Sequence, residues 1–151
     1  MRTWSCATDS SSSAEQVWAT TRQTFLTQVV GPHLESLCRA FALEGGASVF
    51  HEQPAEIGSG TVNDPGNRTQ IDIDVVALAA PQANAPRRIV SLGEAKWGEV
   101  IGHHHLKRLE TARDLLGKKG YDTESTVLAL YGGAGFTDEL TATTVTDDQC
   151  R

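Results

Sequence analysis

Three residues have the types and spacing needed to hold a metal ion and activate water: Asp74, Glu94 and Lys96. Glu94 and Lys96 lie two positions apart in a segment that reads as a strand, so their side chains share a face. If the preceding strand pairs with this one as a hairpin, Asp74 lies across from them. Two carboxylates suit Mg²⁺ or Mn²⁺, and the backbone carbonyl of Ala95 could add a further oxygen ligand. A divalent ion activates water and a lysine stabilises charge, so the set suits attack on a phosphodiester.

The segments that would position these residues begin with two helices. Residues from Ala14 onward have helical character, and Gly31-Pro32 is expected to break the run and start a second helix. Gly45-Gly46 is expected to end that helix. Positions with helical spacing predict the buried side chains of the two helices, which are Val17, Phe25 and Leu26 in the first and Leu34, Leu37, Cys38 and Phe41 in the second.

Strands are predicted next. Residues 48–60 read as a strand or hairpin arm, and 69–79 alternate between β-branched and polar side chains, which is typical of a strand. Residues 87–97 form a second strong strand after a turn. A helix is predicted over 102–117, an apolar strand over 125–131 and a further short strand over 140–145. This order predicts an α/β domain with a mixed sheet.

The segments "IDIDVVAL" and "IVSLGEAKW" resemble the signature of PD-(D/E)XK nuclease domains, and more narrowly the nuclease-like domain at the C-terminus of certain archaeal and bacterial AAA-type ATPases. The resemblance covers about residues 29–132. It implies a restriction-endonuclease-like αβββαβ core, with a mixed central sheet flanked by helices. It also implies Asp74 as the family aspartate and Glu35, on the leading helix, as a further catalytic carboxylate. The chain has no GxxxxGK[ST] motif, so the ATPase part would lie elsewhere.

Several other residues have two readings. Asp72 is either a supporting ligand or an ordinary polar position on a half-exposed strand. Adjacent helical histidines point about 100° apart, so His103, His104 and His105 should not chelate one ion together. They are expected to start a helix near the active face, where His103 could reach a phosphate. Trp97 is expected to pack under a helix. The basic residues that could contact nucleic acid are Arg87, Arg88, Lys107 and Arg108.

Composition sets limits on these ideas. The formal net charge of −6 argues against a strong free-standing nucleic-acid binder, although residues 87–120 hold eight basic and four acidic residues. Three cysteines without a CxxC pair argue against a zinc site or a disulfide framework, and Cys38 reads as a small buried hydrophobe. We expect a flexible lead-in over 1–13, one domain over 14–146 and a polar tail over 147–151. No apolar run suits a signal peptide or a membrane span, so the cytoplasm is the expected location.

Two functions follow as expectations. The first is a Mg²⁺-dependent nuclease module that cleaves DNA, linked to an AAA-type ATPase module, in which a homodimer would let two sites meet two strands. The second is a non-catalytic module of the same fold that binds nucleic acid or a partner protein. A glycoside hydrolase with paired carboxylates ranks below both, because it gives Lys96 no role.

Overall fold

A four-stranded mixed sheet forms the centre of the structure, a computed structural model that describes residues 10–140. Its strands lie side by side in chain order. The first three are antiparallel and the fourth runs parallel to the third. The strands are β1 (Glu56–Asp64), β2 (Thr69–Leu78), β3 (Ile89–Lys96) and β4 (Val127–Gly132). The prediction of an α/β fold with a mixed sheet is confirmed.

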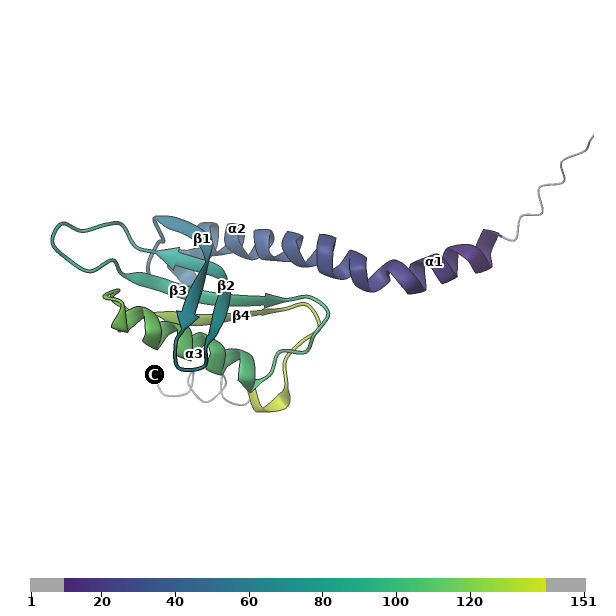
Figure 1. Cartoon of the computed structure of the whole chain (residues 1–151). Coiled ribbons are helices and arrows are strands. Elements are labelled where there is room, and N and C mark those ends of the chain that lie inside the picture. The colour runs from purple at the N-terminus through teal and green to yellow at the C-terminus, as the bar shows by residue number, and fades with distance from the viewer. Residues whose placement is uncertain (1–9, 141–151) are drawn as a thin grey trace, which may run out of the picture.

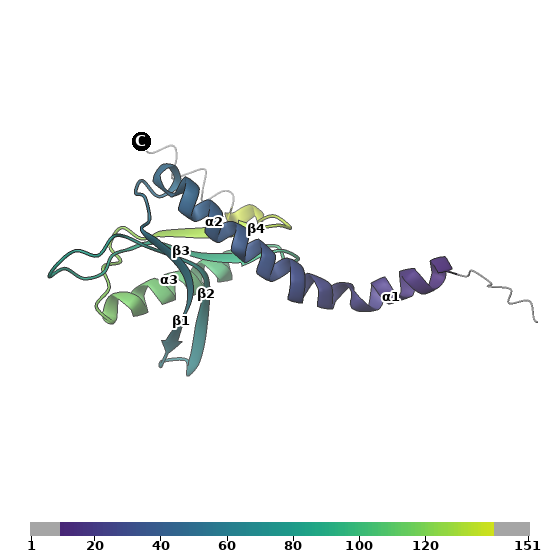
Figure 2. The same cartoon turned by 90° about the horizontal axis from the view of Figure 1, so that it is seen from above.

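One helix covers each face of the sheet, as Figures 1 and 2 show. Helix α2 (Gly31–Val49) lies on one face, and α3 (His103–Lys118), which connects β3 to β4, lies on the other. Each face has its own apolar core. The α2 core contains Cys38, Ala42, Phe50, Val75, Ala77, Ala79, Val90 and Ala95, and the α3 core contains Val62, Ile71, Ile73, Ile89, Leu92, Leu109 and Ala112.

Strand β2 changes the core that it faces at Asp74. Ile73 packs in the α3 core, whereas Val75, two positions later, packs in the α2 core. Side chains two positions apart normally share a face, so β2 must hold an extra residue here. Its pairing with β1 shows this β-bulge, because Gly58 lies opposite Val76 whereas Gly60 lies opposite Ile73. Pairing with β3 also begins here, because Val75 opposite Gly93 is the first pair of that ladder. Asp74 therefore lies at the point where β2 and β3 begin to separate.

The expected break at Gly31-Pro32 is wrong. Helix α1 (Ser10–Phe25) continues through a π-helical turn, η1 (Leu26–Val30), directly into α2. The Gly31 N–H donates to the carbonyl of Leu26, five residues back, and Pro32 occupies the first turn of α2. Proline has no N–H to donate and its ring crowds the preceding turn, so a widened turn lets the helix continue past it.

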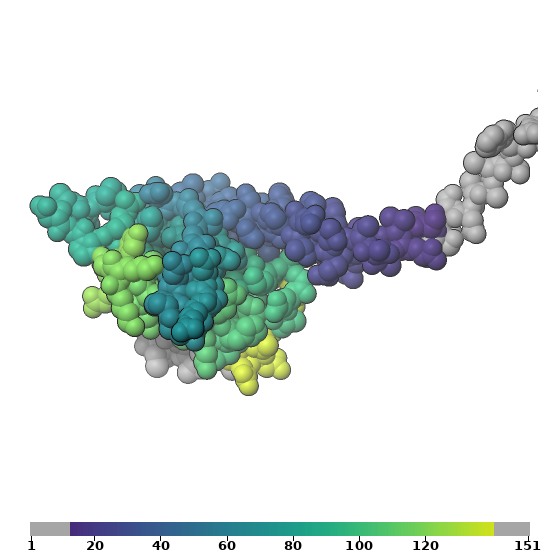
Figure 3. Space-filling model, viewed as in Figure 1, coloured from purple at the N-terminus to yellow at the C-terminus, as the bar shows by residue number. Residues whose placement is uncertain are grey.

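The prediction that this helix buries its apolar stripe is also wrong in large part. Figure 1 and the space-filling view in Figure 3 show that α1 extends away from the body. The exposed fraction is 62% for Val17, 43% for Phe25, 53% for Leu37 and 52% for Phe41. Leu26 and Leu34 are half-buried, and Cys38 is buried as predicted. Only the face of α2 that turns to the sheet has a partner within the described part of the chain.

Gly45-Gly46 does not end the helix, which continues to Val49. For this reason residues 48 and 49, predicted as strand, are helical, and β1 begins only at Glu56. The glycine at position 46 has a packing role instead. A Cβ atom there would lie 2.4 Å from Cδ of Pro54, so only glycine allows the loop before β1 to approach this closely.

The later elements follow the predictions closely. The helix expected over 102–117 is α3, and the strand expected over 125–131 is β4, with one face toward each core. Within residues 10–140, no helix is long and apolar enough to cross a membrane. The strand expected over 140–145 falls almost wholly outside the described residues, as do parts of the expected lead-in and the whole expected tail.

Candidate functional site

Asp74 is fixed against the strand that carries the other two predicted site residues. Its Oδ2 atom accepts a hydrogen bond of 2.8 Å from the backbone N–H of Ala95. At this level β3 pairs with β4 on its other side, with Ala95 opposite Tyr131. The side chain of Asp74 thus takes the place of a backbone partner at the opening between β2 and β3. The hydrogen bond leaves the second carboxylate oxygen of Asp74 available to a ligand.

Glu94 is almost completely buried, with 1% of its surface exposed. Its Oε1 atom lies 3.2 Å from Nζ of Lys96 and 3.1 Å from a guanidinium nitrogen of Arg108 on α3. The first contact confirms that Glu94 and Lys96 share a face of β3. The Oε2 atom is also buried, and no hydrogen-bond partner for it exists among the described residues. A buried carboxylate oxygen without a partner is costly, so a cation or a donor from a ligand would stabilise it.

Glu35 approaches this region through an arginine that the sequence reasoning missed. Arg39, one turn later on α2, lies 3.7 Å from Glu35 and donates a 2.8 Å hydrogen bond to the backbone carbonyl of Asp74. Arg39 follows Glu35 by four residues on a helix, and this spacing alone could have predicted an ion pair between the two. Cys38 lies nearby, and burial, followed by the charge of Asp74, raises the pKa of its thiol. This cysteine therefore stays protonated and packs as a hydrophobe.

A hollow of about 470 Å³ opens beside Arg108, between α3 and the β1–β2 hairpin. Helix α3 lines it with basic and polar side chains, including Lys107 and Arg108, and the hairpin contributes Asp64 and Asn67. The Asp64 carboxylate accepts hydrogen bonds from the side-chain amide of Asn67 and from the backbone N–H groups of Asn67 and Gly66, which lower its pKa. These bonds fix the turn that forms one wall of the hollow.

The four predicted nucleic-acid contacts divide into two groups. Lys107 and Arg108 line the hollow, and Arg108 also reaches Glu94. Arg87 and Arg88 lie just before β3, whereas Glu94 and Lys96 lie at its end. Arg87 pairs with Glu56, and Arg88 pairs with Glu52. Both of these guanidinium groups are therefore engaged within the chain.

The N-terminus of α3 holds a second cluster, in which Glu99, a residue not predicted from the sequence, joins two of the three histidines. Glu99, His104 and His105 each offer a ligand atom, and these atoms lie within 4.8 Å of one another. The prediction that neighbouring histidines point apart is wrong for this pair, since their ring centres are 3.8 Å apart. His103 remains exposed at the first position of α3.

Hydrogen bonding at His105 limits what this cluster can bind. Nδ1 of the buried His105 accepts the backbone N–H of Gly102, in a reciprocal cap of the helix. In a neutral ring the proton then sits on Nε2, the nitrogen that faces Glu99 at 3.6 Å. A transition metal on Nε2 would require that proton to move to Nδ1, which would break the cap. The cluster is thus a hydrogen-bonded helix start.

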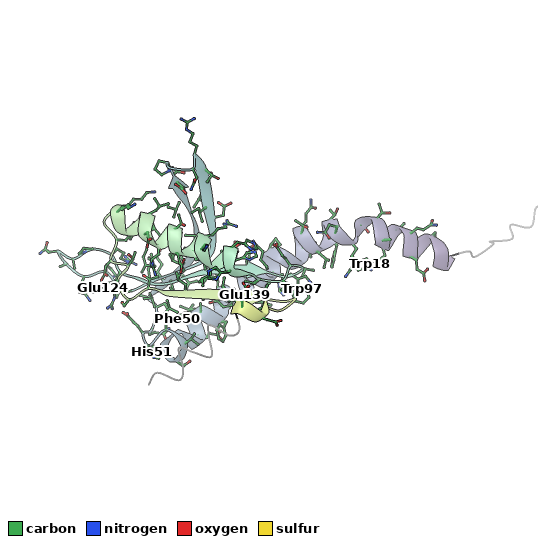
Figure 4. The ribbon with its side chains drawn as sticks, turned by 90° about the horizontal axis from the view of Figure 1, so that it is seen from below. Trp18, Phe50, His51, Trp97, Glu124 and Glu139 are labelled. Atoms are coloured by element: carbon green, nitrogen blue, oxygen red, sulfur yellow. The ribbon has the colours of Figure 1, made fainter. Side chains whose placement is uncertain are left out.

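Two further predictions have clear outcomes. Asp72 is exposed, and its Oδ1 atom accepts a hydrogen bond from the Thr61 hydroxyl of β1, which matches the reading as a polar strand position. Trp97 is half-exposed and does not pack under a helix. Its indole covers Gly133, where a Cβ atom would lie 2.6 Å from the ring. Figure 4 shows Trp97 at the end of the sheet, well away from Trp18 on α1.

The structure therefore gathers Asp74, Ala95, Glu94 and Lys96 at the end of β3, with Glu35 linked through Arg39 and with Arg108 arriving from α3. Arg108 as the ion partner of Glu94 was not foreseen, because the two residues meet only when α3 packs on the sheet. Comparison with protein-family models, with curated proteins and with solved structures found no match for this chain.

Proposed function

We propose that this chain is a metal-dependent nuclease module that hydrolyses phosphodiester bonds of DNA, built on a restriction-endonuclease-like core. The observation that carries the proposal is the buried Oε2 atom of Glu94, which has no partner among the described residues. It lies beside a lysine on the same face of β3, at the place where Asp74 closes the opening between two strands. The order α2-β1-β2-β3-α3-β4 also fits the αβββαβ core.

The donor set fits a hard divalent cation such as Mg²⁺ or Mn²⁺. Glu94 would supply Oε2, Asp74 its free oxygen and Ala95 its backbone carbonyl, and oxygen ligands are those that such ions prefer. When bound, the ion would activate water and neutralise charge on a phosphoryl group. The Glu99–His104–His105 cluster suits Mg²⁺ poorly, because two of its three ligand atoms are nitrogens.

The chain's own residues would do the remaining work. The ammonium group of Lys96, held by Glu94, would orient the attacking water or stabilise the negative charge that develops on the phosphoryl oxygens. Arg108, next to the same carboxylate and on the wall of the hollow, would bind a phosphate of the substrate backbone. Lys107 would extend this basic edge along α3. Substrate would thus reach Glu94 from the hollow between α3 and the hairpin.

The test is a cleavage assay on single-stranded, duplex and branched DNA with Mg²⁺, Mn²⁺ or EDTA. Wild type is compared with Glu94→Gln and Lys96→Ala. Lys119→Ala, an exposed lysine just after α3, is the matched control. Glu94→Gln keeps the volume of the side chain and removes its charge, so thermal unfolding should separate loss of activity from loss of folding. We expect cutting that EDTA abolishes and that both site variants reduce at least about hundredfold.

Two results would overturn the assignment. Metal-dependent cutting that survives both substitutions would place the chemistry elsewhere. Folded wild type that binds DNA with equal affinity in Mg²⁺ and EDTA, and cuts none of the substrates, would favour the non-catalytic binding module. Two contacts favour that second function: the ion pairs of Lys96 and Arg108 with Glu94 already balance its charge, so the site can be stable without a metal ion.

A further inference from the structure

The long helix formed by α1, η1 and α2 carries an apolar face that its own sheet does not cover. Phe25, Val29, Leu37 and Phe41 are each about half exposed, and they recur at intervals of four or eight residues. In an α-helix a step of four residues advances by about 40°, so such a row drifts around the surface. The π-helical turn at Leu26–Val30 holds extra residues in one turn and reduces this drift.

This face is separate from the one that α2 buries. Cys38, Ala42 and Gly46 of α2 turn to the sheet, whereas Leu37 and Phe41 stay exposed. Trp18 extends the apolar face into α1, where its ring lies 5.8 Å from that of Phe25. Figures 2 and 4 show this part of the helix standing clear of the body. Exposed aromatic side chains aligned along a helix are typical of a protein interface.

Three pairs of exposed apolar residues on this helix are symmetric about His33, whereas Trp18 and Leu43 fall outside the pattern. Phe25 and Phe41 lie eight residues on either side of it, and Val29 and Leu37 lie four residues on either side. Two exposed valines, Val17 and Val49, lie sixteen residues away in each direction and extend the pattern. Two copies packed antiparallel with His33 on the two-fold axis would therefore match an apolar residue with an apolar residue at each of these positions.

One pair of opposite charges on the helix follows the same symmetry, and Glu15, Glu35 and Arg39 have no charged counterpart in it. Arg22 and Glu44, both exposed, lie eleven residues before and after His33. In the antiparallel pair each Arg22 would face Glu44 of the other copy, once on each side of the axis. A parallel pair would instead place Arg22 against Arg22 and Glu44 against Glu44, which is unfavourable. Self-complementary spacing of this kind is what a two-fold symmetric interface requires.

We propose that the chain forms a homodimer through an antiparallel pairing of its α1–η1–α2 helices, in which α1 of each copy packs on the exposed face of the other copy's α2. The paired stretch would be about 50 Å long between helices about 10 Å across. That extent is suited to the roughly 800 Å² per partner that specific dimers bury. The pairing also gives the protruding α1 a partner, and it leaves α3 and the hollow free on the opposite face of the sheet.

Sedimentation of the full chain, at protein concentrations from micromolar to ~100 µM, tests whether it dimerises. Charge reversal tests the geometry of the pairing. We expect a dimer whose dissociation constant rises about tenfold with either Arg22→Glu or Glu44→Arg, because each change creates two like-charge contacts. The double variant Arg22→Glu/Glu44→Arg should return to within about threefold of wild type. Lys119→Glu, outside the helix, should leave the constant unchanged. Helix content by circular dichroism excludes simple unfolding.

Cross-linking gives an independent measurement of direction. Arg22→Cys and Glu44→Cys are made in a background with Cys6→Ser and Cys150→Ser, which leaves the buried Cys38 as the other thiol. A short bismaleimide should join the two variants when they are mixed and should join neither variant to itself, since identical positions would lie about 33 Å apart. Self-cross-linking of Arg22→Cys, failure of the double charge reversal to restore association, or a monomer at all concentrations would overturn the proposal.

Discussion

The carboxylate of Asp74 accepts a hydrogen bond from the backbone N–H of Ala95, with 2.8 Å between Oδ2 and N, at the point where β2 and β3 begin to separate. One side chain therefore joins two strands and holds a charge at the candidate metal site. These two roles can be separated, because asparagine also offers a side-chain oxygen to the N–H but carries no charge.

Asp74→Asn should keep most of the stability and lose cleavage activity, whereas Asp74→Ala should lose both. We expect the alanine variant to lower the free energy of unfolding by about 1–3 kcal/mol, because it leaves the Ala95 N–H without its partner. Urea unfolding and the cleavage assay on the same preparations measure the two effects. Equal stability of the two variants would show that the hydrogen bond contributes little.

Arg108 should stabilise the fold mainly through the buried charge of Glu94. Arg108→Met removes one of the two cations at Oε1 and leaves Lys96, so we expect a loss of about 1–3 kcal/mol. The same substitution in a Glu94→Gln background should cost less, with a coupling of about 1 kcal/mol in a double-mutant cycle. Unfolding in urea at neutral pH measures all four proteins. Additive effects would contradict the ion pair.

The strands were predictable because their pattern is local. The alternation around Asp74 and the apolar run before Glu94 each indicate a strand by themselves. The exposure of Phe41 was not predictable in this way, because an apolar stripe on a helix looks the same whether its partner is a sheet or a second molecule. The effect of Gly46 was hidden for a related reason, since its close neighbour Pro54 belongs to the following loop.

The candidate site was predictable to a similar extent. Two positions on one strand place Glu94 and Lys96 on a common face, and their contact confirms this. Arg108 could be identified as a basic helix residue but not as the partner of a buried carboxylate, because that contact depends on how α3 packs against β3. Neighbouring His104 and His105 were expected to diverge by regular helix geometry, which does not hold for these side chains at the first turn of α3.

Lys107 should contribute to DNA binding, and Arg88 should not. Lys107 is exposed on the wall of the hollow, whereas Arg88 is paired with Glu52 at the other end of β3. We expect Lys107→Ala to weaken binding to all sequences alike. It should also reduce the slope of log affinity against log salt concentration by the equivalent of about one phosphate contact. Arg88→Ala, the matched control, should leave the slope unchanged. Fluorescence anisotropy with Ca²⁺ in place of Mg²⁺, over a salt series, measures both.

Tyr131 should make the fold less stable in alkali. Burial raises the pKa of its phenol to about 12, and the Cys38 thiol, once deprotonated in alkali, adds to the rise. The unfolded phenol loses its proton near pH 10, so between about pH 10 and about 12 the native state holds a proton that the unfolded state releases. The stabilisation is therefore complete below pH 10 and is lost as the pH rises through about 12.

Tyr131→Phe should reduce this decline. The hydroxyl is buried and has no hydrogen-bond partner among residues 10–140, so its removal should be neutral or slightly stabilising at pH 7. Urea unfolding at pH 7 and at about pH 11.5 measures the difference between the two proteins. A variant that loses as much stability in alkali as wild type would show that Tyr131 is not the responsible group.

The adjacent glycines of α2 should respond to alanine in opposite directions. At Gly46 a Cβ atom would lie 2.4 Å from Cδ of Pro54, so Gly46→Ala must displace the loop before β1, at a cost of about 1–3 kcal/mol. At Gly45 the nearest atoms to a Cβ atom would be those of the Phe41 ring, at 3.6 Å or more. Gly45→Ala should therefore stabilise the helix by about 0.5–1 kcal/mol. Thermal and urea unfolding of the two variants measure the contrast. Similar effects of both substitutions would mean that Pro54 does not pack against the helix as described.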